Sequence, residues 1–229
     1  FKLEKWAHPM FGRSEHCPGV VYDEDQHQAN ALKGKPTNFI WFQDTSVEKT
    51  AAGRKYIQQG EAEDLHTRYK CRIRKVWYSV PSVYSTEVGM LKRSHDTPRL
   101  ILNKIGAYTT DTAYRIRAKE GTADQLVYGF LNGLTALSAE LEGRHYGGGV
   151  LELVPSEIEK LLLPPPSRIK PRVAELDKAV RTMSMDDVLA LQTKRVLGDM
   201  GLSKKDQGEL LSGWNRLRNR RHRISSEAA

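Results

Sequence analysis

The sequence predicts an α+β fold, with a mixed or antiparallel sheet and a long packed helix, followed by a small C-terminal helical segment. Three observations lead to this prediction. Apolar residues alternate in several short segments, they recur every three or four positions over residues 122–143, and the pattern becomes wholly helical after the prolines at 164–166. A chain of 229 residues makes one large or two modest domains, so we expect units at 1–166 and 167–229.

The region before the long helix favours short strands. The first sixty residues show little helical period, and turn-rich segments there separate the apolar runs Val20–Tyr22 and Phe39–Phe42. Tyr69–Val80 has a clear strand pattern. Leu100–Asn103 and Ala113–Ala118 predict two further strands.

The long helix has a start signal and a stop signal. Thr122 and Gln125 form a capping box, and Gly143 is the expected end. Val150–Val154 then predicts another strand. One face of the helix carries an apolar stripe, formed by Val127, Phe130, Leu131, Leu134, Leu137 and Leu141.

The C-terminal part shows two further helix starts. Ser184 with Asp187 and Ser203 with Asp206 have capping-box spacing, and Gly201 separates the two helices. The last helix has arginines over most of its surface and one apolar face, made of Leu210, Leu211, Trp214 and Leu217.

Composition excludes several classes of protein. With 39% hydrophobic and 28% charged residues, the chain is not disordered, collagenous or coiled-coil. No apolar run approaches the roughly 18–20 residues of a membrane span, so we expect no membrane partner. Cys17 and Cys71 are too few for a disulfide scaffold or a four-cysteine zinc site. With no visible signal peptide, the cytoplasm is the expected location.

The charge is strongly basic and clustered. The chain has 36 Lys and Arg against 28 Asp and Glu, a net charge of +8. Five arginines lie between Arg216 and Arg223, and a second cluster runs from Arg68 to Lys75. Such an excess favours a polyanionic partner, most often nucleic acid.

The second cluster predicts a basic strand face. In a strand, Arg68, Lys70, Arg72 and Arg74 share one face, with neighbours about 6.6 Å apart. Each pair repels by roughly 0.6 kcal/mol in water, inside the ~8 Å Debye length. Unless carboxylates on adjacent strands neutralise it, this face needs an external anion. We favour phosphate over the alternative, an edge strand that charge protects from aggregation.

Aromatic and glycine residues add weaker signals. Trp77 and Tyr78 follow the cations, where aromatics suit base stacking, although a strand Trp is more often core and we favour core for Trp77. Gly147–Gly149, beside Arg144 and Tyr146, would let a backbone approach a ligand, but a flexible turn is the simpler interpretation.

Motifs of catalysis are missing. The sequence has no Asn-Pro-Pro or Asp-Pro-Pro, no Gly-x-Gly between a strand and a helix, and no His-Glu-x-x-His. No lysine has Asp or Glu two positions before it, as the commonest nuclease metal site requires. We therefore expect no catalytic residue, metal or cofactor in this chain, and interpret it as a binding module.

Six segments have a characteristic order and spacing. They are Tyr69–Pro81, Ile101–Asn103, Tyr114–Ile116, Leu131–Gly133, Glu140–Pro155 and Leu163–Pro164. Over roughly Trp6 to Pro166 they resemble the C-terminal target-recognition domain of TaqI-like adenine-specific (N6) DNA methyltransferases of bacterial restriction–modification systems. The tail Trp214–Arg221 is similar in a less specific way.

The resemblance implies sequence-specific recognition of double-stranded DNA. It implies a domain that faces DNA across a cleft, while a separate catalytic domain, in the same protein or complex, transfers a methyl group from S-adenosylmethionine. The catalytic half, with its cofactor loop and Asn-Pro-Pro-aromatic motif, is absent from this sequence. The chain alone should therefore not methylate DNA.

Methylation requires the adenine to leave the base stack, at a cost of a few kcal/mol. A recognition domain must therefore hold the backbone while it contacts base edges. Three sets of residues suit these roles: Arg68, Lys70, Arg72 and Arg74 for the backbone, Arg144, Tyr146, Gly147 and Gly148 for close approach, and Asn103 or Arg115 for bases. We expect Lys75 and Tyr78 to bind DNA as well.

Two other functions stay open. In the first, the chain is a protein-interaction scaffold whose C-terminal helices dock a partner subunit, with the arginine tail serving that interface or an RNA. In the second, it is the specificity module of a restriction enzyme complex, which shares the DNA role.

Overall fold

A four-stranded sheet forms the centre of the molecule. Its order is β2 (Val21–Tyr22), β6 (Leu100–Asn103), β4 (Val88–Leu91) and β8 (Ala113–Ile116). β2 runs parallel to β6, and the other pairs are antiparallel. The computed structural model describes residues 2–81 and 83–223. It confirms the α+β fold. Three of the predicted strands are confirmed in this sheet, where they form β2, β6 and β8.

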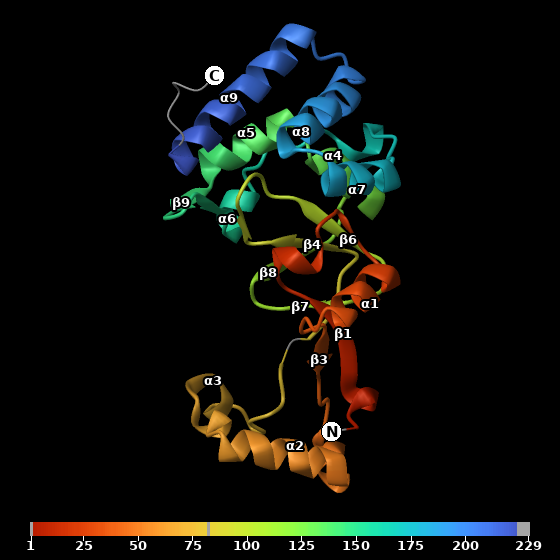
Figure 1. Ribbon diagram of the computed structural model, residues 1–229, viewed down its shortest axis with the longest axis vertical. Coiled ribbons are helices and arrows are strands. Elements are labelled where there is room, and N and C mark those ends of the chain that lie inside the picture. The colour runs from red at the N-terminus through yellow and green to blue at the C-terminus, as the bar shows by residue number, and fades with distance from the viewer. Residues whose placement is uncertain (1, 82, 224–229) are drawn as a thin grey trace.

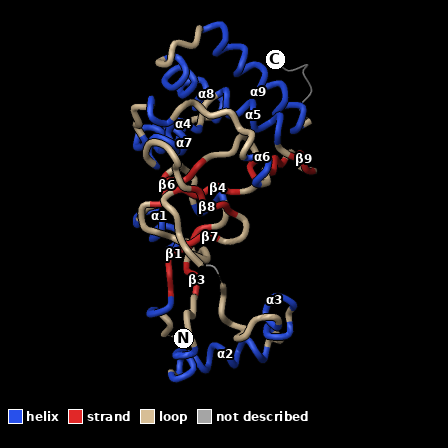
Figure 2. The backbone as a smooth tube through the Cα atoms, turned by 180° about the vertical axis from the view of Figure 1, so that it is seen from behind, coloured by secondary structure: helices blue, strands red, loops and turns tan. Residues whose placement is uncertain are grey.

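Two three-stranded sheets accompany the central one. In strand order they are β3 (Asn38–Ile40), β1 (Ala7–Phe11) and β7 (Tyr108–Thr109), and then β5 (Arg93–Ser94), β10 (Val150–Glu152) and β9 (Arg144–Tyr146). Figure 2 shows the strands gathered in the middle of an elongated molecule, with helices toward both ends.

The helices near the C-terminus cover one end of the central sheet (Figure 1). α4 packs on β6, and α7 packs on β2. These helices are α4 (Ala123–Phe130), α5 (Gly133–Glu142), the short α6 (Pro155–Ile158), α7 (Val173–Thr182), α8 (Met185–Thr193) and α9 (Lys204–His222). The predicted starts at Thr122, Ser184 and Ser203 are confirmed, since each side chain accepts a hydrogen bond from the first turn of its helix.

The predicted long helix is broken in two. Leu131 leaves the helical conformation, and the Asn132 side chain accepts hydrogen bonds from the amides of Leu134 (2.9 Å) and Thr135 (3.1 Å), which starts α5. An asparagine bonded in this way competes with helix continuation. The apolar stripe is therefore not one face, and Leu141 at its end is 67% exposed.

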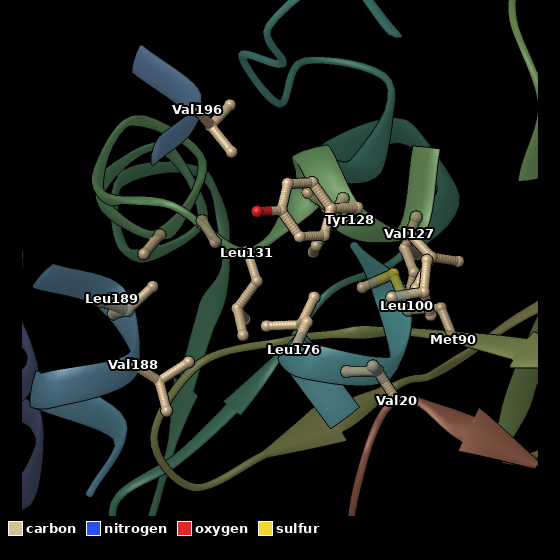
Figure 3. Packing of buried hydrophobic residues seen from close by; sticks show 14 of the residues in the cluster. Val20, Met90, Leu100, Val127, Tyr128, Leu131, Leu176, Val188, Leu189 and Val196 are labelled. Carbon is tan, nitrogen blue, oxygen red and sulfur yellow. The ribbon is translucent and has the colours of Figure 1, made fainter. Parts of the chain in front are cut away.

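One core joins the sheet to the helices on both sides of the prolines. Figure 3 shows Leu131 close to Leu176 of α7, with Val188 of α8 beside them and Leu100 of β6 on the sheet side. Trp214 of α9 is wholly buried in the same cluster. The division at residue 166 stays a prediction, because a shared core does not say whether either part folds alone.

Two helices lie in the region for which the sequence predicted only strands and loops. They are α1 (Glu24–Leu32), capped by Asp23, and α2 (Ala51–Ala62), capped by Thr50. The low helical period misled the prediction because α1 is mostly polar and buries only Asn30. A helix with a polar surface leaves no apolar stripe in the sequence.

The predicted strand Tyr69–Val80 is also wrong. The chain forms a 3₁₀ turn at Leu65–Thr67 and the one-turn helix α3 (Tyr69–Arg72), followed by turns and loop. In this segment cations alternate with Tyr69, Cys71 and Ile73. Over so few residues the same pattern also fits a helical turn, because Tyr69 and Ile73 are four positions apart and share one face of a helix. Among the residues that the structure describes, no strand pairs with this segment, so local hydrogen bonds within the segment decide its structure.

α2 and α3 form an arm at the opposite end of the molecule from α9 (Figure 1). We call residues 51–81 the arm. The arm and the N-terminal part of the chain share a small core separate from the central one, and Trp77 packs there against Gly60, where an added Cβ would lie 2.4 Å from the indole. Trp77 is partly buried against this core, in line with the interpretation favoured from the sequence. The buried residues of this core are Leu3, Phe42, Val47 and Ile57.

Within the described ranges, no helix combines the length and the apolar character needed to cross a membrane.

Candidate nucleic-acid interface

The arm concentrates positive charge. It carries seven Lys and Arg against three Asp and Glu, half of the net charge of the whole chain. Among the residues that the structure describes, none of these seven cations forms an ion pair. Arg68, Lys70, Arg72 and Lys75 are exposed. Charges of one sign held this close favour an anion from outside the chain.

The one-turn helix changes how these side chains are presented. Arg68 and Arg72 lie one turn apart, so they share a face, whereas the four alternate cations do not. Tyr69 and Ile73 are 67% and 64% exposed on the same turn, and the Arg72 guanidinium lies 5.8 Å from the Tyr69 ring centre. The arm therefore offers cations together with an exposed aromatic and an exposed aliphatic side chain.

Two predicted contacts on the arm have structural partners. Arg74 is half-buried, and its Nη1 donates to the Trp77 carbonyl at 3.4 Å. The Tyr78 hydroxyl donates to Glu48 Oε1. Burial first, and this hydrogen bond second, raise the pKa of Tyr78 far above its usual value. Both residues hold the arm in shape, which leaves Arg68, Lys70, Arg72 and Lys75 as its accessible cations.

A second basic cluster lies on the edge strand β8. The Arg115 guanidinium stacks 3.8 Å from the centre of the Tyr84 ring, and that of Arg117 lies 5.9 Å from it. Strand alternation places both exposed arginines on one face. Arg117 also borders a hollow of about 640 Å³, together with Lys104. Tyr84 and Arg117 were not predicted, because no local pattern links Tyr84 to a strand some thirty residues later.

The glycine run forms the turn of the β9–β10 hairpin. Gly148 and Gly149 have φ of 75° and 72°, values that favour glycine. Side chains at Gly147 and Gly148 would meet no atom within 4 Å, so this tip is open to solvent. The turn geometry explains the glycines without a ligand, in agreement with the simpler interpretation.

Arg144 of the hairpin and Arg93 of the neighbouring strand β5 have carboxylate partners. Arg144 Nε lies 2.6 Å from Glu157 Oε1, and this hydrogen bond raises the pKa of Arg144. Arg93 Nε lies 2.5 Å from Glu152 Oε2, while its guanidinium sits 5.9 Å from the half-exposed Tyr146 ring. A DNA phosphate would have to compete with these carboxylates, so the hairpin is a weaker anion site than the arm.

Asn103 has a structural role. Its Nδ2 donates to the carbonyls of Thr86 (2.9 Å) and Ala107 (2.8 Å), and its Oδ1 accepts from the Ala107 amide at 2.9 Å. The side chain is buried. Contact with a base would break bonds that hold this turn, so Arg115 is the better placed of the two predicted base readers.

Two of the five arginines of the C-terminal tail are engaged within the fold. Arg221 pairs with buried Glu140, and Arg218 pairs with Asp186 while lying 4.4 Å from the Trp214 ring centre. These arginines fix α9 to the rest of the helical end. The tail therefore offers an RNA or a partner less charge than its sequence suggests.

The glycine run does not fit an S-adenosylmethionine cradle. Such cradles use a glycine-rich turn between a strand and a helix, and Gly147–Gly149 join two antiparallel strands. Over residues 2–81 and 83–223, no group of three His, Cys, Asp or Glu side chains is placed to hold a metal ion.

The predicted residues do not meet in one cluster. In the views of Figures 1 and 2, the arm and the β9–β10 hairpin lie toward the same edge of the molecule but at opposite ends, with β8 between them. Three separate sets result, on the arm, on β8 and on the hairpin. A ligand that touched all three would have to be long.

Residues 1–197 match the family model of the C-terminal domain of the type II methyltransferase M.Eco57I. No curated protein matches the sequence. Among solved structures, the type IIG restriction endonuclease BpuSI has a similar fold over 97% of this chain, with 13% identity and a TM-score of 0.54.

The chain spans about a quarter of that endonuclease, 27% of its length. At 13% identity, this likeness concerns the fold alone. The family match covers most of the described residues, including the arm, the sheets and the helices through η6 (Lys194–Gly198). The chain therefore belongs to the family of type II methyltransferase C-terminal domains represented by M.Eco57I.

Proposed function

We propose that this chain is the DNA target-recognition domain of an adenine-specific, TaqI-like methyltransferase of a bacterial restriction–modification system. It binds double-stranded DNA in the cytoplasm, while a catalytic domain elsewhere in the same protein or complex transfers the methyl group from S-adenosylmethionine. The observation that carries the DNA partner is the set of exposed arm cations that form no ion pair. The family match supports the link to methyltransferases.

The arm and the β8 cluster suit two different kinds of contact along a duplex, one with the backbone and one with the bases. Arg68 and Arg72 on one face of α3 hold phosphates, a contact that positions the protein without reading sequence. Arg115 and Arg117, stacked on Tyr84, present guanidinium groups of the kind that pair with guanine edges in the major groove. A backbone grip of this kind offsets the few kcal/mol needed to extrude an adenine.

A gel shift of short duplexes by this chain tests the proposal. We expect binding at low salt that weakens when Arg68→Ala and Arg72→Ala are combined. A matched control, Arg216→Ala with Arg220→Ala, removes the same charge from exposed positions on α9 and should bind nearly as the wild type does. A folded wild-type chain that shifts no duplex at low salt contradicts the proposal.

The adenine assignment needs the parent protein. Incubated with labelled S-adenosylmethionine and DNA, the parent should produce N6-methyladenine, identified by mass spectrometry of the nucleosides. Methylated cytosine would overturn adenine specificity and leave DNA recognition standing.

A second candidate, the protein-interaction scaffold, is favoured by one feature of the helical end. An apolar hollow of about 590 Å³ is bordered by Leu134 and Leu137 of α5, Met200, and Leu210 of α9. In a longer parent protein, the other domains would have to pack on some surface of this domain. Leu137→Ser should then weaken association with the catalytic part and leave the gel shift unchanged.

A further inference from the structure

A basic pocket lies at the helical end, away from the arm. It is a hollow of about 480 Å³ between the segment that precedes α7 and the helix η6. Four cations border it: Arg168, Lys170, Arg172 and Arg195. Asp199 is the one carboxylate among the described residues that border it.

Three of these cations have no partner in the described chain. Arg195 lies 3.1 Å from Glu175, but the side chains of Arg168, Lys170 and Arg172 are exposed and form no ion pair or hydrogen bond. Prolines precede and interrupt this short segment and fix its backbone, so the positive charges stay close together. Their mutual repulsion favours an anion in the pocket.

Tyr128 supplies a hydrogen-bonding group at the same place. The residue is 3% exposed and borders the pocket, and its hydroxyl has no hydrogen-bond partner among the residues described. Figure 3 shows the hydroxyl directed away from Val127 and toward the side where Val196 of η6 lies. This hydroxyl is not fully enclosed, because Tyr128 borders the hollow, and an oxyanion bound there would accept a hydrogen bond from it.

The walls of the pocket are also suited to an anion. η6 is a π-helix, a rare element that is frequently found at functional sites. On the other side, α7 begins after Arg172 with no side-chain cap, so amides of its first turn stay available at the positive end of the helix.

We propose that this pocket binds a phosphate group. The phosphate comes either from the backbone of a bound duplex or from a small phosphorylated molecule. The first source rests on the proposed function, and the second does not. In both cases Arg168, Lys170 and Arg172 surround the phosphate oxygens, and Tyr128 donates its hydroxyl proton to one of them.

Thermal unfolding in sodium phosphate, compared with sodium chloride of equal ionic strength, tests the site. We expect phosphate to raise the midpoint of the wild-type chain by about 2–4 °C, and to raise that of Arg168→Gln with Arg172→Gln by much less. The variant Arg216→Gln with Arg220→Gln removes the same charge elsewhere and should respond as the wild type does. Tyr128→Phe, which removes only the hydroxyl, should weaken phosphate binding roughly fivefold.

Duplex binding, measured by fluorescence anisotropy over a salt series, identifies the source. If the backbone supplies the phosphate, the pocket variant flattens the log–log salt slope by about 1–2, at roughly 0.9 for each phosphate. An unchanged slope with a lost phosphate response assigns the pocket to a small molecule. A wild-type chain that binds no duplex but keeps the pocket-dependent response overturns the proposed function and supports the pocket. An equal phosphate response in the wild type and the pocket variant, or no response beyond that of chloride, overturns the pocket.

Discussion

Arg221 and Glu140 form a bidentate ion pair in the interior, between the last turn of α9 and the last turns of α5. Arg221 Nη2 lies 2.6 Å from Glu140 Oε1, and Nε lies 3.0 Å from Oε2, with both side chains wholly buried. Arg221 also donates to the carbonyls of His95 and Asp96 and to that of Gly149 in the hairpin turn. A buried charge pair is tolerated here because nearly every donor of the guanidinium has an acceptor.

Breaking this pair from one side should destabilise the fold strongly. Arg221→Met leaves the buried Glu140 carboxylate with only the His145 ring beside it, 3.6 Å away, and we expect a loss of about 3–5 kcal/mol in the free energy of unfolding, measured in urea. The double variant Arg221→Met with Glu140→Leu should recover much of it. The neighbouring exposed Arg220→Ala should change stability by roughly 0.5 kcal/mol or less. A single Arg221→Met as stable as the wild type would show that the pair contributes nothing.

The break at Asn132 predicts unequal effects along the apolar stripe. Leu131 is 2% exposed in the core, so Leu131→Ala should cost about 2–5 kcal/mol. Leu134 is half-buried beside the apolar hollow, so Leu134→Ala should cost less. Leu141→Ala should be nearly neutral, since that side chain is 67% exposed. Equal losses at all three positions, measured by chemical unfolding, would instead indicate one continuous buried stripe.

The arm cations should set part of the salt dependence of DNA binding. Arg68→Ala with Arg72→Ala should flatten the log–log slope of affinity against salt by about two units, at roughly 0.9 for each phosphate. Specific and random duplexes should weaken alike, because backbone contacts carry no sequence information. Titrations at several salt concentrations measure the slope. Parallel lines for this variant and the wild type would show that α3 does not touch the backbone.

The stacked cluster on β8 should behave differently. Arg115→Ala is expected to relax preference at one base position by about 1–3 kcal/mol, with little change for random DNA. Tyr84→Phe keeps the ring beneath both guanidinium groups and should bind as the wild type does, whereas Tyr84→Ala should resemble the arginine variant. A selection from randomised duplexes measures the preference. If Arg115→Ala weakens every sequence equally, it contacts phosphate and not a base.

The two cysteines should differ in reactivity. Burial raises the pKa of Cys17 from 9.0 to about 12, and its thiol lies against the carbonyls of Gly19 and Val21. Alkylation near pH 8, followed by mass spectrometry, should modify the half-buried Cys71 and spare Cys17 until the chain unfolds.

The same shift gives a pH dependence. Because the folded pKa of Cys17 exceeds the unfolded value, its contribution to stability is complete below pH 9 and is lost as the pH rises toward about 12. Cys17→Ala should lessen this decline in urea unfolding at alkaline pH. An identical decline in the variant would assign it to other groups.

Local signals predicted the parts of the fold that local forces decide. Thr122 and Gln125 lie three residues apart and form their capping box as expected. Asn132 was overlooked because the apolar spacing runs through it, although an Asn inside a helical pattern is itself a signal for a break. The basic segment from Arg68 was placed in a strand because only the absence of a partner strand, a property of the whole fold, decides against it.

The candidate site depended still more on distant contacts. Tyr84 meets Arg115, and Arg221 meets Glu140 across 81 positions, and neither pair leaves a pattern in a short window. The five arginines near the C-terminus appeared as one charged surface. Two of them, Arg218 and Arg221, form ion pairs within the fold. These pairs could not be predicted from the sequence, because the carboxylates that they contact are distant along the chain.

The ion pair between α9 and α5 also orders events during synthesis of the protein. Glu140 leaves the ribosome 81 residues before Arg221, which at roughly 5–20 residues per second is a wait of several seconds. Throughout that time its carboxylate has no guanidinium to meet, so the end of α5 must stay open to water. The hairpin turn and the His95 loop lack their common anchor for as long. We therefore expect nascent chains that stop short of α9 to have a loose helical end, even though every strand has already been made.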